Sequence, residues 1–136
     1  MKYLFDAGSI AEILTQRRED AVNTLAGEST LDLAIYELGN VVWKESRLKK
    51  RSEDETSTNV GFVEQVLGVM DIQRIQLSEI QEIERNAIKL ALSFYDASYY
   101  TKAKTCERTL VTEDEHLKRA AREVDVPCLS VDDIPA

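Results

Sequence analysis

Four acidic residues stand where a sheet edge or a helix can present a carboxylate. The apolar run YLF ends on Asp6, although strands disfavour aspartate. Asp96 opens a helix-like stretch in FYDASYY, Asp114 follows the strand-like run TLVT, and Glu37 lies at the edge of the apolar face of AIYELGNVVWK. Carboxylates that gather at one point repel one another unless a cation lies between them. Such a gathering would indicate a site for Mg²⁺ or Mn²⁺ and metal-assisted phosphodiester hydrolysis.

Each of these acids also has an ordinary structural alternative. Asp6 and Asp96 can cap the helices that follow them, and Asp114 can complement the dipole of a helix capped by Thr112. Glu37 can be a boundary residue that bends out to water. The joint pattern favours a site, because the three aspartates are expected at one edge of one sheet.

Strand-like and helix-like segments alternate along the chain. The predicted strands are 2–5, 30–34, 72–77, 109–112 and 126–131, and the predicted helices are 7–14, 18–26, 34–50, one through 60–70, 79–92, 96–107 and 113–123. This alternation predicts one α/β domain over residues 1–136, with a parallel sheet covered on both faces. Functional crevices in such sheets lie beyond the carboxyl ends of the strands, where Asp6 and Asp114 are expected.

Capping signals mark the starts of three of these helices. Ser52 or Asp54 is expected to cap the helix through 60–70. The expected capping boxes are Ser78 with Gln81 and Thr112 with Glu115.

Composition and single residues narrow the range of functions. The net charge of −8 does not indicate a general nucleic-acid binder. No apolar run approaches the ~18 residues of a membrane span, and the start lacks the hydrophobic region of a signal peptide, so a cytoplasmic location is expected. His116 is the single histidine, which excludes a two-histidine ribonuclease, and it is expected at the surface. Cys106 and Cys128 have no metal-ligand spacing and are expected to be small core residues.

Three other kinds of site lack their defining residues. A glycine-rich phosphate loop and a zinc motif are both missing from the sequence. A phosphatase of the haloacid-dehalogenase type needs an acid two residues after the first, where Gly8 stands. A response-regulator receiver needs an acid pair before its central aspartate, and that pair is missing too.

Aromatic and basic residues follow Glu37 on the same predicted helix. Tyr36 and Trp43 are seven residues apart and lie opposite its apolar stripe. They are expected either to pack against the helix through 60–70 or to line a groove for a partner segment. The basic run consists of Lys44, Arg47, Lys49, Lys50 and Arg51. It can complement the helix dipole or contact RNA phosphates.

Four segments together resemble PIN-domain proteins of the VapC toxin type. They are YLFDAGSI at 3–10, YELGNVVWK at 36–44, SFYDASYYTKA at 93–103 and LVTEDEHL at 110–117. The resemblance implies a three-layer α/β/α sandwich with a short parallel sheet and an endoribonuclease that depends on Mg²⁺ or Mn²⁺. It also implies that the metal-binding and catalytic acids are Asp6, Glu37, Asp96 and Asp114.

The same resemblance implies further site residues and partners. The hydroxyls of Ser9 and Thr112 correspond to small hydroxyl residues near the first and last acids, and Lys44 and Arg47 are candidate substrate contacts. A VapB-type antitoxin and a homodimer are the implied partners. Two alternatives stay open, namely a PIN nuclease of RNA processing or decay and a catalytically silent PIN module that only binds a protein.

Overall fold

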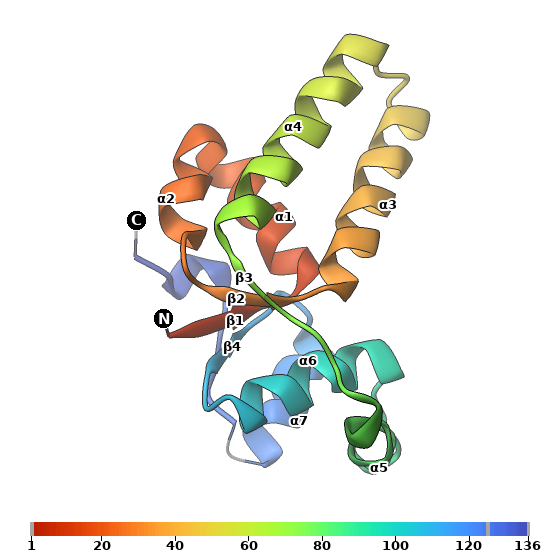
Figure 1. Cartoon of the computed structure of the whole chain (residues 1–136), viewed down its shortest axis with the longest axis vertical. Helices are drawn as coiled ribbons and strands as arrows, with labels where there is room; N and C mark the ends of the chain where they lie inside the picture. The colour runs from red at the N-terminus through yellow and green to blue at the C-terminus, as the bar shows by residue number, and fades with distance from the viewer. Residues whose placement is uncertain (1, 125, 136) are drawn as a thin grey trace.

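Five short parallel strands form the centre of the computed structural model, which describes residues 2–124 and 126–135 (Figure 1). The strands lie in the order β3-β2-β1-β4-β5. Their bounds are β1 Tyr3–Phe5, β2 Ser29–Leu31, β3 Asp71–Gln73, β4 Thr109–Val111 and β5 Cys128–Leu129. β1 pairs in parallel with β2 and β4, with Leu4 opposite Ser29 and Leu110. The middle of the sheet is therefore built from segments about a hundred residues apart.

Seven α-helices and three short 3₁₀ helices connect the described strands. The α-helices are α1 Ala7–Arg17, α2 Ala21–Leu25, α3 Leu33–Leu48, α4 Glu53–Val69, α5 Ile80–Leu90, α6 Phe94–Thr105 and α7 Glu115–Glu123. The 3₁₀ helices are η1 Arg18–Asp20, η2 Leu77–Glu79 and η3 Val131–Asp133. Figure 1 shows α1–α4 on one side of the sheet and α5–α7 on the other. The predicted three-layer α/β/α fold with a parallel sheet is confirmed.

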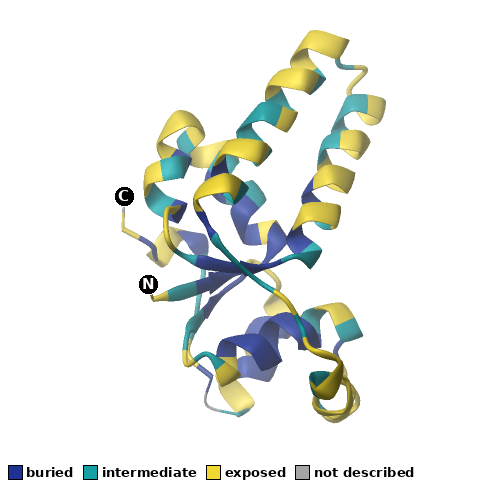
Figure 2. Cartoon of the chain, in the orientation of Figure 1, coloured by how far each residue is buried: buried dark blue, intermediate teal, exposed yellow. Residues whose placement is uncertain are grey.

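Alternation along the central strands divides the core between the two layers. Leu4 and Leu110 join the cluster packed under α5–α7, whereas Phe5 and Val111 join the cluster packed under α1–α4. All four side chains are fully buried, because helices cover both faces of a parallel sheet. Figure 2 shows this buried centre as a dark band that continues into the helix faces turned toward it.

The alternation of elements predicted from the sequence is confirmed, but four of the predicted segments are too long. Strands 30–34, 72–77 and 126–131 shrink to 29–31, 71–73 and 128–129, and Leu77 is exposed at the start of η2. Helix 18–26 is split into the turn η1 and the five-residue helix α2. The apolar pattern does not separate a strand from the apolar residues that flank it.

Ser52 caps α4 as expected, in a capping box with Glu55. Both of the capping boxes predicted from the sequence are wrong. The turn at the start of η2 is closed instead by Gln76, whose backbone N–H donates to Glu79 Oε1 at 2.7 Å. Asp114 rather than Thr112 caps α7. Spacing alone does not decide which of several polar residues has the extended backbone that a cap requires.

Helices α3 and α4 project from the sheet as an antiparallel pair whose far ends are exposed (Figures 1 and 2). Tyr36 and Trp43 on α3 are 76% and 53% exposed. The expected packing of these two aromatic residues against the helix through 60–70 is therefore wrong.

Within the described residues, none of the helices is long and apolar enough to cross a membrane.

Candidate active site

Asp6 lies at the junction between β1 and α1, where it performs two tasks at once. It caps α1, since its Oδ1 accepts a hydrogen bond from the Ser9 amide at 2.8 Å. Its Oδ2 accepts a hydrogen bond from the Thr112 hydroxyl, which follows β4. The Asp6 side chain is buried at the carboxyl end of the sheet. The expected cap and the expected position at the sheet edge are both confirmed.

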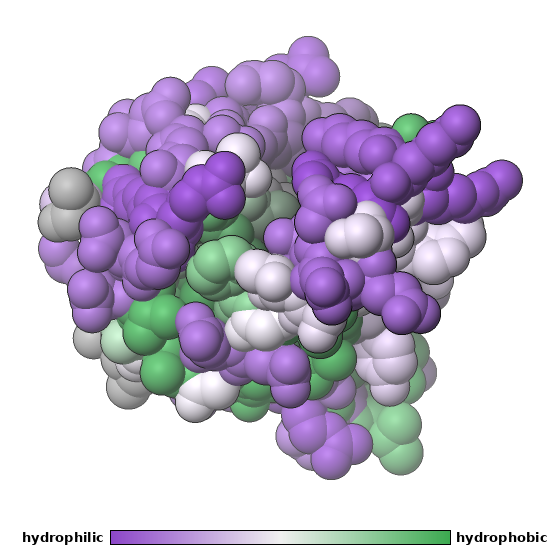
Figure 3. Space-filling model, turned by 90° about the horizontal axis from the view of Figure 1, so that it is seen from above, coloured by the Kyte–Doolittle hydropathy of each residue, from purple (hydrophilic) through white to green (hydrophobic). Residues whose placement is uncertain are grey.

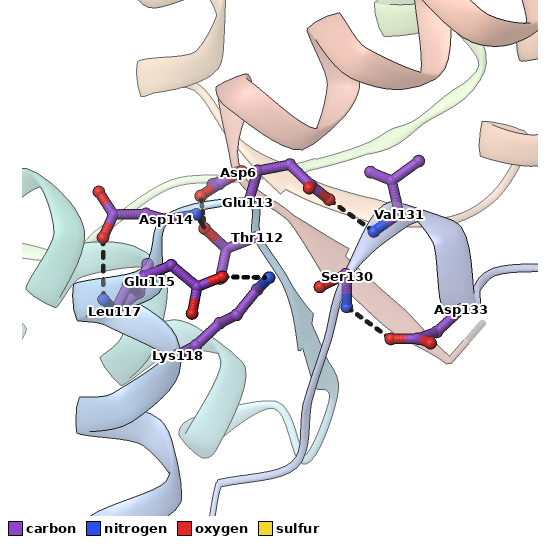
Figure 4. Close-up of polar contacts among 10 residues, drawn as sticks. All are labelled: Asp6, Thr112, Glu113, Asp114, Glu115, Leu117, Lys118, Ser130, Val131 and Asp133. Atoms are coloured by element: carbon purple, nitrogen blue, oxygen red, sulfur yellow. Dashed lines mark hydrogen bonds and ion pairs between the residues drawn. The ribbon is translucent and has the colours of Figure 1, made fainter.

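Thr112 connects Asp6 to Asp114 (Figure 4). The fully buried Thr112 hydroxyl donates to Asp6 and accepts from the Asp114 amide at 3.1 Å. Asp114 in turn caps α7, because its Oδ1 accepts from the Leu117 amide at 3.0 Å. One buried hydroxyl therefore holds the two sheet-edge acids in register.

The acids on either side of Asp114 have other partners. Glu113 accepts from the Val131 amide at 2.6 Å, and Glu115 forms an ion pair with Lys118 at 3.3 Å (Figure 4). These contacts direct both side chains away from Asp6, in agreement with the surface roles that acids in a first helical turn usually have.

Asp96 lies in the first turn of α6, and its expected role as the cap of that helix is wrong. Ser93 is the cap, and its hydroxyl accepts from the Asp96 amide at 3.0 Å. The Asp96 carboxylate is half-buried, and a hydrogen bond with the Ser93 side chain lowers its pKa against the effect of burial. An ion pair between Lys102 on α6 and Glu79 on η2, at 2.9 Å, fixes this helix against its neighbour.

Glu37 reaches the site from the opposite layer, where the hydroxyl of Tyr99 donates to its Oε1 at 2.7 Å. Tyr99 lies on α6, is almost fully buried, and has its pKa raised by burial and by the Glu37 carboxylate. This tyrosine was missed by the sequence analysis. Its signal was available, since a buried tyrosine needs a hydrogen-bond partner and Tyr99 follows Asp96 by one helical turn.

Electrostatic interactions join the four acids around Asp96. Burial, with a smaller contribution from the Asp96 charge, raises the pKa of Asp6 to about 6 against the lowering effect of its hydrogen bonds. Burial also raises the pKa of Glu37, again with a contribution from Asp96. The pKa of Asp96 is itself raised by burial and then by Asp114. Asp96 therefore interacts electrostatically with each of the other three acids that the sequence singled out.

His116 also faces this group, although it lies at the surface as expected. Its charge acts on Asp96 in the direction that lowers the pKa of that carboxyl. The sequence predicts only a surface position for His116, and its proximity to Asp96 is decided by the tertiary structure.

The donor chemistry of the group fits a hard divalent cation. All four side chains offer carboxylate oxygens, which Mg²⁺ and Mn²⁺ prefer. Burial first, and then the charge of a neighbouring acid, raises the pKa of Asp6, Glu37 and Asp96, and a cation would relieve this cost. Asp6 accepts two hydrogen bonds and keeps further lone pairs. Among residues 2–124 and 126–135, however, no three acid, histidine or cysteine side chains are close enough to form a ready-made metal site.

Ser9 does not have the expected position for a substrate contact. It is fully buried, and its hydroxyl donates to the backbone carbonyls of Asp6 and Val111, at 2.9 Å each. We therefore assign Ser9 to the junction of β1, α1 and β4. Thr112 is equally buried, and its hydroxyl forms hydrogen bonds with Asp6 and Asp114. Lys44 and Arg47 are exposed along α3.

Cys106 and Cys128 are half-buried rather than core residues. Burial raises the pKa of the Cys128 thiol to about 11, so this cysteine is a poor nucleophile at neutral pH.

The chain is similar to two curated proteins of Pyrobaculum aerophilum. It is 31% identical to Exonuclease VapC9 over 132 residues, which cover 96% of this chain and 95% of that protein. It is also 31% identical to Ribonuclease VapC3 over 126 residues, covering 86% and 92% of the two chains. No family model matches the sequence.

Two solved structures share the fold. The crystal structure of PAE2754 from Pyrobaculum aerophilum superposes with a TM-score of 0.81 at 28% identity, covering 97% of this chain and 92% of that one. VapBC2 from Rickettsia felis, bound to a DNA fragment from its promoter, gives a TM-score of 0.66 at 16% identity over 96% and 98% of the two chains. At 16% identity the likeness shows the fold alone.

Replacing Asp6 with asparagine should stabilise the metal-free protein at neutral pH. A folded-state pKa of about 6, against 3.8 ordinarily, means that the folded chain binds this proton more tightly than the unfolded chain. This difference lowers the free energy of unfolding as the pH rises above ~4. The loss is complete above pH ~6 and amounts to about 3 kcal/mol. Asparagine caps as well as aspartate, but its NH₂ group cannot accept the Thr112 hydrogen bond, which costs about 1 kcal/mol. Asp6→Asn should therefore still raise the urea midpoint at pH 7.5 in EDTA, by the remaining difference.

The pH dependence and a matched variant provide the control. Most of the gain from Asp6→Asn should be lost at pH 4, and it should vanish at pH 3, where Asp6 is protonated in both the folded and the unfolded chain. Asp20→Asn replaces an exposed acid on η1 and should give no such gain. An Asp6→Asn chain that is less stable than wild type at pH 7.5 would contradict the assigned burial.

Replacing Ser9 with alanine should lower stability. The change removes a buried hydroxyl that bonds two carbonyls, which costs about 1 kcal/mol. Urea unfolding of Ser9→Ala is compared with Ser57→Ala, an exposed serine on α4 in which the same gain of helix propensity occurs. Equal midpoints for the two variants would show that the Ser9 hydroxyl is not a structural group.

Proposed function

This chain belongs to the VapC family of PIN-domain proteins, and from that premise we propose that it is a metal-dependent endoribonuclease and the toxin of a VapBC-type pair. One observation carries the proposal. Four carboxylates from four elements interact at the carboxyl end of the sheet, and burial and mutual repulsion raise the pKa of three of them. Such a group is costly to assemble unless it holds a cation.

The proposed metal-binding residues are Asp6, Glu37, Asp96 and Asp114, with Mg²⁺ or Mn²⁺ as the ion. When bound, the ion supplies a Lewis acid that activates water and neutralises charge on the phosphodiester. The chain holds the acids in place for this task. Thr112 fixes Asp6 and Asp114, and Tyr99 fixes Glu37, so the carboxylates do not need to be ordered when substrate arrives.

Three alternative functions differ in the substrate, partner or acids that they require. A relative is named an exonuclease, which would need a free RNA end. A PIN nuclease of RNA processing or decay would use the same acids without an antitoxin. A silent interaction module would not need four interacting acids, so their presence favours an enzyme.

Cleavage should require the acids as a unit. Asp6→Asn, Asp96→Asn and Glu37→Gln should each lower the rate on the order of a hundredfold or more, because each removes charge that must hold a cation and a phosphate together. Asp114→Asn should be milder, as an outer acid acts through bound water. The assay uses a labelled linear RNA and a circular RNA of the same sequence, in Mg²⁺, in Mn²⁺ and in EDTA.

Each arm of this assay has an outcome that contradicts part of the proposal. Undiminished cleavage in EDTA would exclude the metal, and near wild-type rates in the acid variants would exclude the site. An intact circular RNA beside a degraded linear one would indicate an exonuclease. Asp20→Asn is the matched control and should cleave normally, and circular dichroism must stay native throughout.

A cavity between α1, α3 and α4 supports the proposed antitoxin. It has a volume of about 250 Å³, and its lining includes the apolar residues Leu38, Val41 and Phe62 and the basic residues Arg18 and Lys49. Within the described part of the chain, the Nε atom of a further lining residue, Arg51, is buried without a hydrogen-bond partner. We propose that a VapB-type antitoxin places an apolar segment with an acidic side chain here, and that the toxin itself forms a homodimer.

A charge inside this cavity should weaken the antitoxin complex and spare the chemistry. Val41→Asp places a carboxylate on a partly exposed lining residue and should weaken binding roughly tenfold or more, since the partner would bury an unpaired charge. Binding of a VapB-type antitoxin is measured by calorimetry, together with RNA cleavage. The control Ile88→Asp lies on the exposed face of α5 and should bind normally. Equal affinity for both variants would place the antitoxin elsewhere.

A further inference from the structure

The outward face of α3 carries two exposed aromatic side chains next to a proposed metal-binding acid. Tyr36 is 76% and Trp43 is 53% exposed, and their seven-residue spacing places them on one stripe about 10 Å apart. We propose that this face binds single-stranded RNA and leads it to Glu37, with bases stacked on Tyr36 and Trp43 and phosphates on Lys44 and Arg47. The proposal rests on the proposed ribonuclease function and names the form of RNA that this function uses.

Helical geometry places the basic residues beside both features. Arg47 follows Trp43 by one turn on the aromatic stripe, and its guanidinium lies 5.5 Å from the centre of the Trp43 ring. Lys44 follows Glu37 by two turns and therefore continues the stripe of the acid itself. A strand that follows α3 toward the sheet would meet a cation, then an aromatic face, then the carboxylate.

The charge distribution favours RNA over an apolar partner on this face. The chain carries a net charge of −8, yet five of its 17 lysines and arginines lie between residues 44 and 51. The described structure gives ion pairs to Arg51, with Glu45 and Glu55, and none to Lys44 or Arg47. Figure 3, which looks onto the end where α3 and α4 project, shows mostly hydrophilic side chains around a band of apolar ones. Lys44, which has no ion pair within the described residues, and Arg47, which contacts the Trp43 ring, lie beside exposed aromatic side chains, and this arrangement matches the surfaces that bind single strands.

Stacking on these rings requires unpaired bases. Bases in a duplex already stack on one another and present only their edges, whereas an unpaired base offers its face to an aromatic side chain. A single strand would also need this basic surface to overcome repulsion between its phosphates and the four acids before a metal ion binds.

Trp43 is the single tryptophan, so its fluorescence reports directly on this face. The experiment titrates the Asp6→Asn chain in Mg²⁺ with a 12-residue single-stranded RNA, with its duplex, and with an abasic strand of equal length. We expect the single strand to quench the fluorescence and the other two to quench it far less. Labelled RNA gives the affinity of variants by anisotropy, and Tyr36→Ala and Trp43→Ala should each bind about tenfold more weakly.

Conservative and matched variants separate stacking from charge. Trp43→Phe keeps an aromatic ring and should retain most of the affinity. Lys44→Ala and Arg47→Ala should each reduce the salt slope of binding by about 0.7, the value for one contact to a single strand. Ile88→Ala and Lys89→Ala remove an exposed apolar residue and a cation from α5, and both should bind as the parent chain does.

Cleavage by the wild-type chain distinguishes failure of this inference from failure of the proposed function. If the wild type cleaves the same RNA but Trp43→Ala binds it normally and RNA leaves the fluorescence unchanged, the RNA surface on α3 is refuted. Fluorescence that responds instead to the chain's own concentration would refute it too and assign the face to a protein contact. If the wild type cleaves no RNA with either metal, the proposed function itself fails.

Discussion

The buried hydrogen bond from Thr112 to Asp6 is the contact on which the site depends. It joins the ends of two adjacent parallel strands whose residues are about a hundred positions apart, and it holds a carboxylate where burial alone would favour its protonation. The Ser9 amide supplies a second hydrogen bond to the same group. Together these donors offset part of the cost of burial and leave the rest for a cation to relieve.

Asp114 and Asp96 are also positioned by the ends of helices. Asp114 is at once a helix cap and a neighbour of Asp6, through the hydroxyl that both contact. Asp96 takes no part in capping, because Ser93 does so, and its charge is therefore directed at the other acids. Helix ends thus orient carboxylates at the edge of the sheet, where a helix N-terminus already favours negative charge.

The site lies at the boundary between the two helical layers. Asp96 and Asp114 come from the layer of α6 and α7, and Glu37 comes from α3 in the opposite layer, reached across the edge by Tyr99. Because α3 continues away from the site into a projecting pair with α4, it offers two different surfaces. The side facing α1 and α4 lines an apolar cavity, and the outward side carries exposed aromatic and basic residues.

The sequence by itself determined the succession of strands and helices along the chain and the burial of both faces of the sheet. It also singled out the four acids as candidate site residues, because all of these follow from local periodicity and from residue type. Only the tertiary structure decided which partner each polar group has. Tyr99 contacts Glu37 across 62 positions, and Thr112 contacts Asp6 across 106. The burial of Ser9 and the exposure of Trp43 were decided in the same way. Local patterns report which side of an element is apolar, but a side chain's partner depends on which distant segment packs beside it, and that is fixed only when the layers assemble.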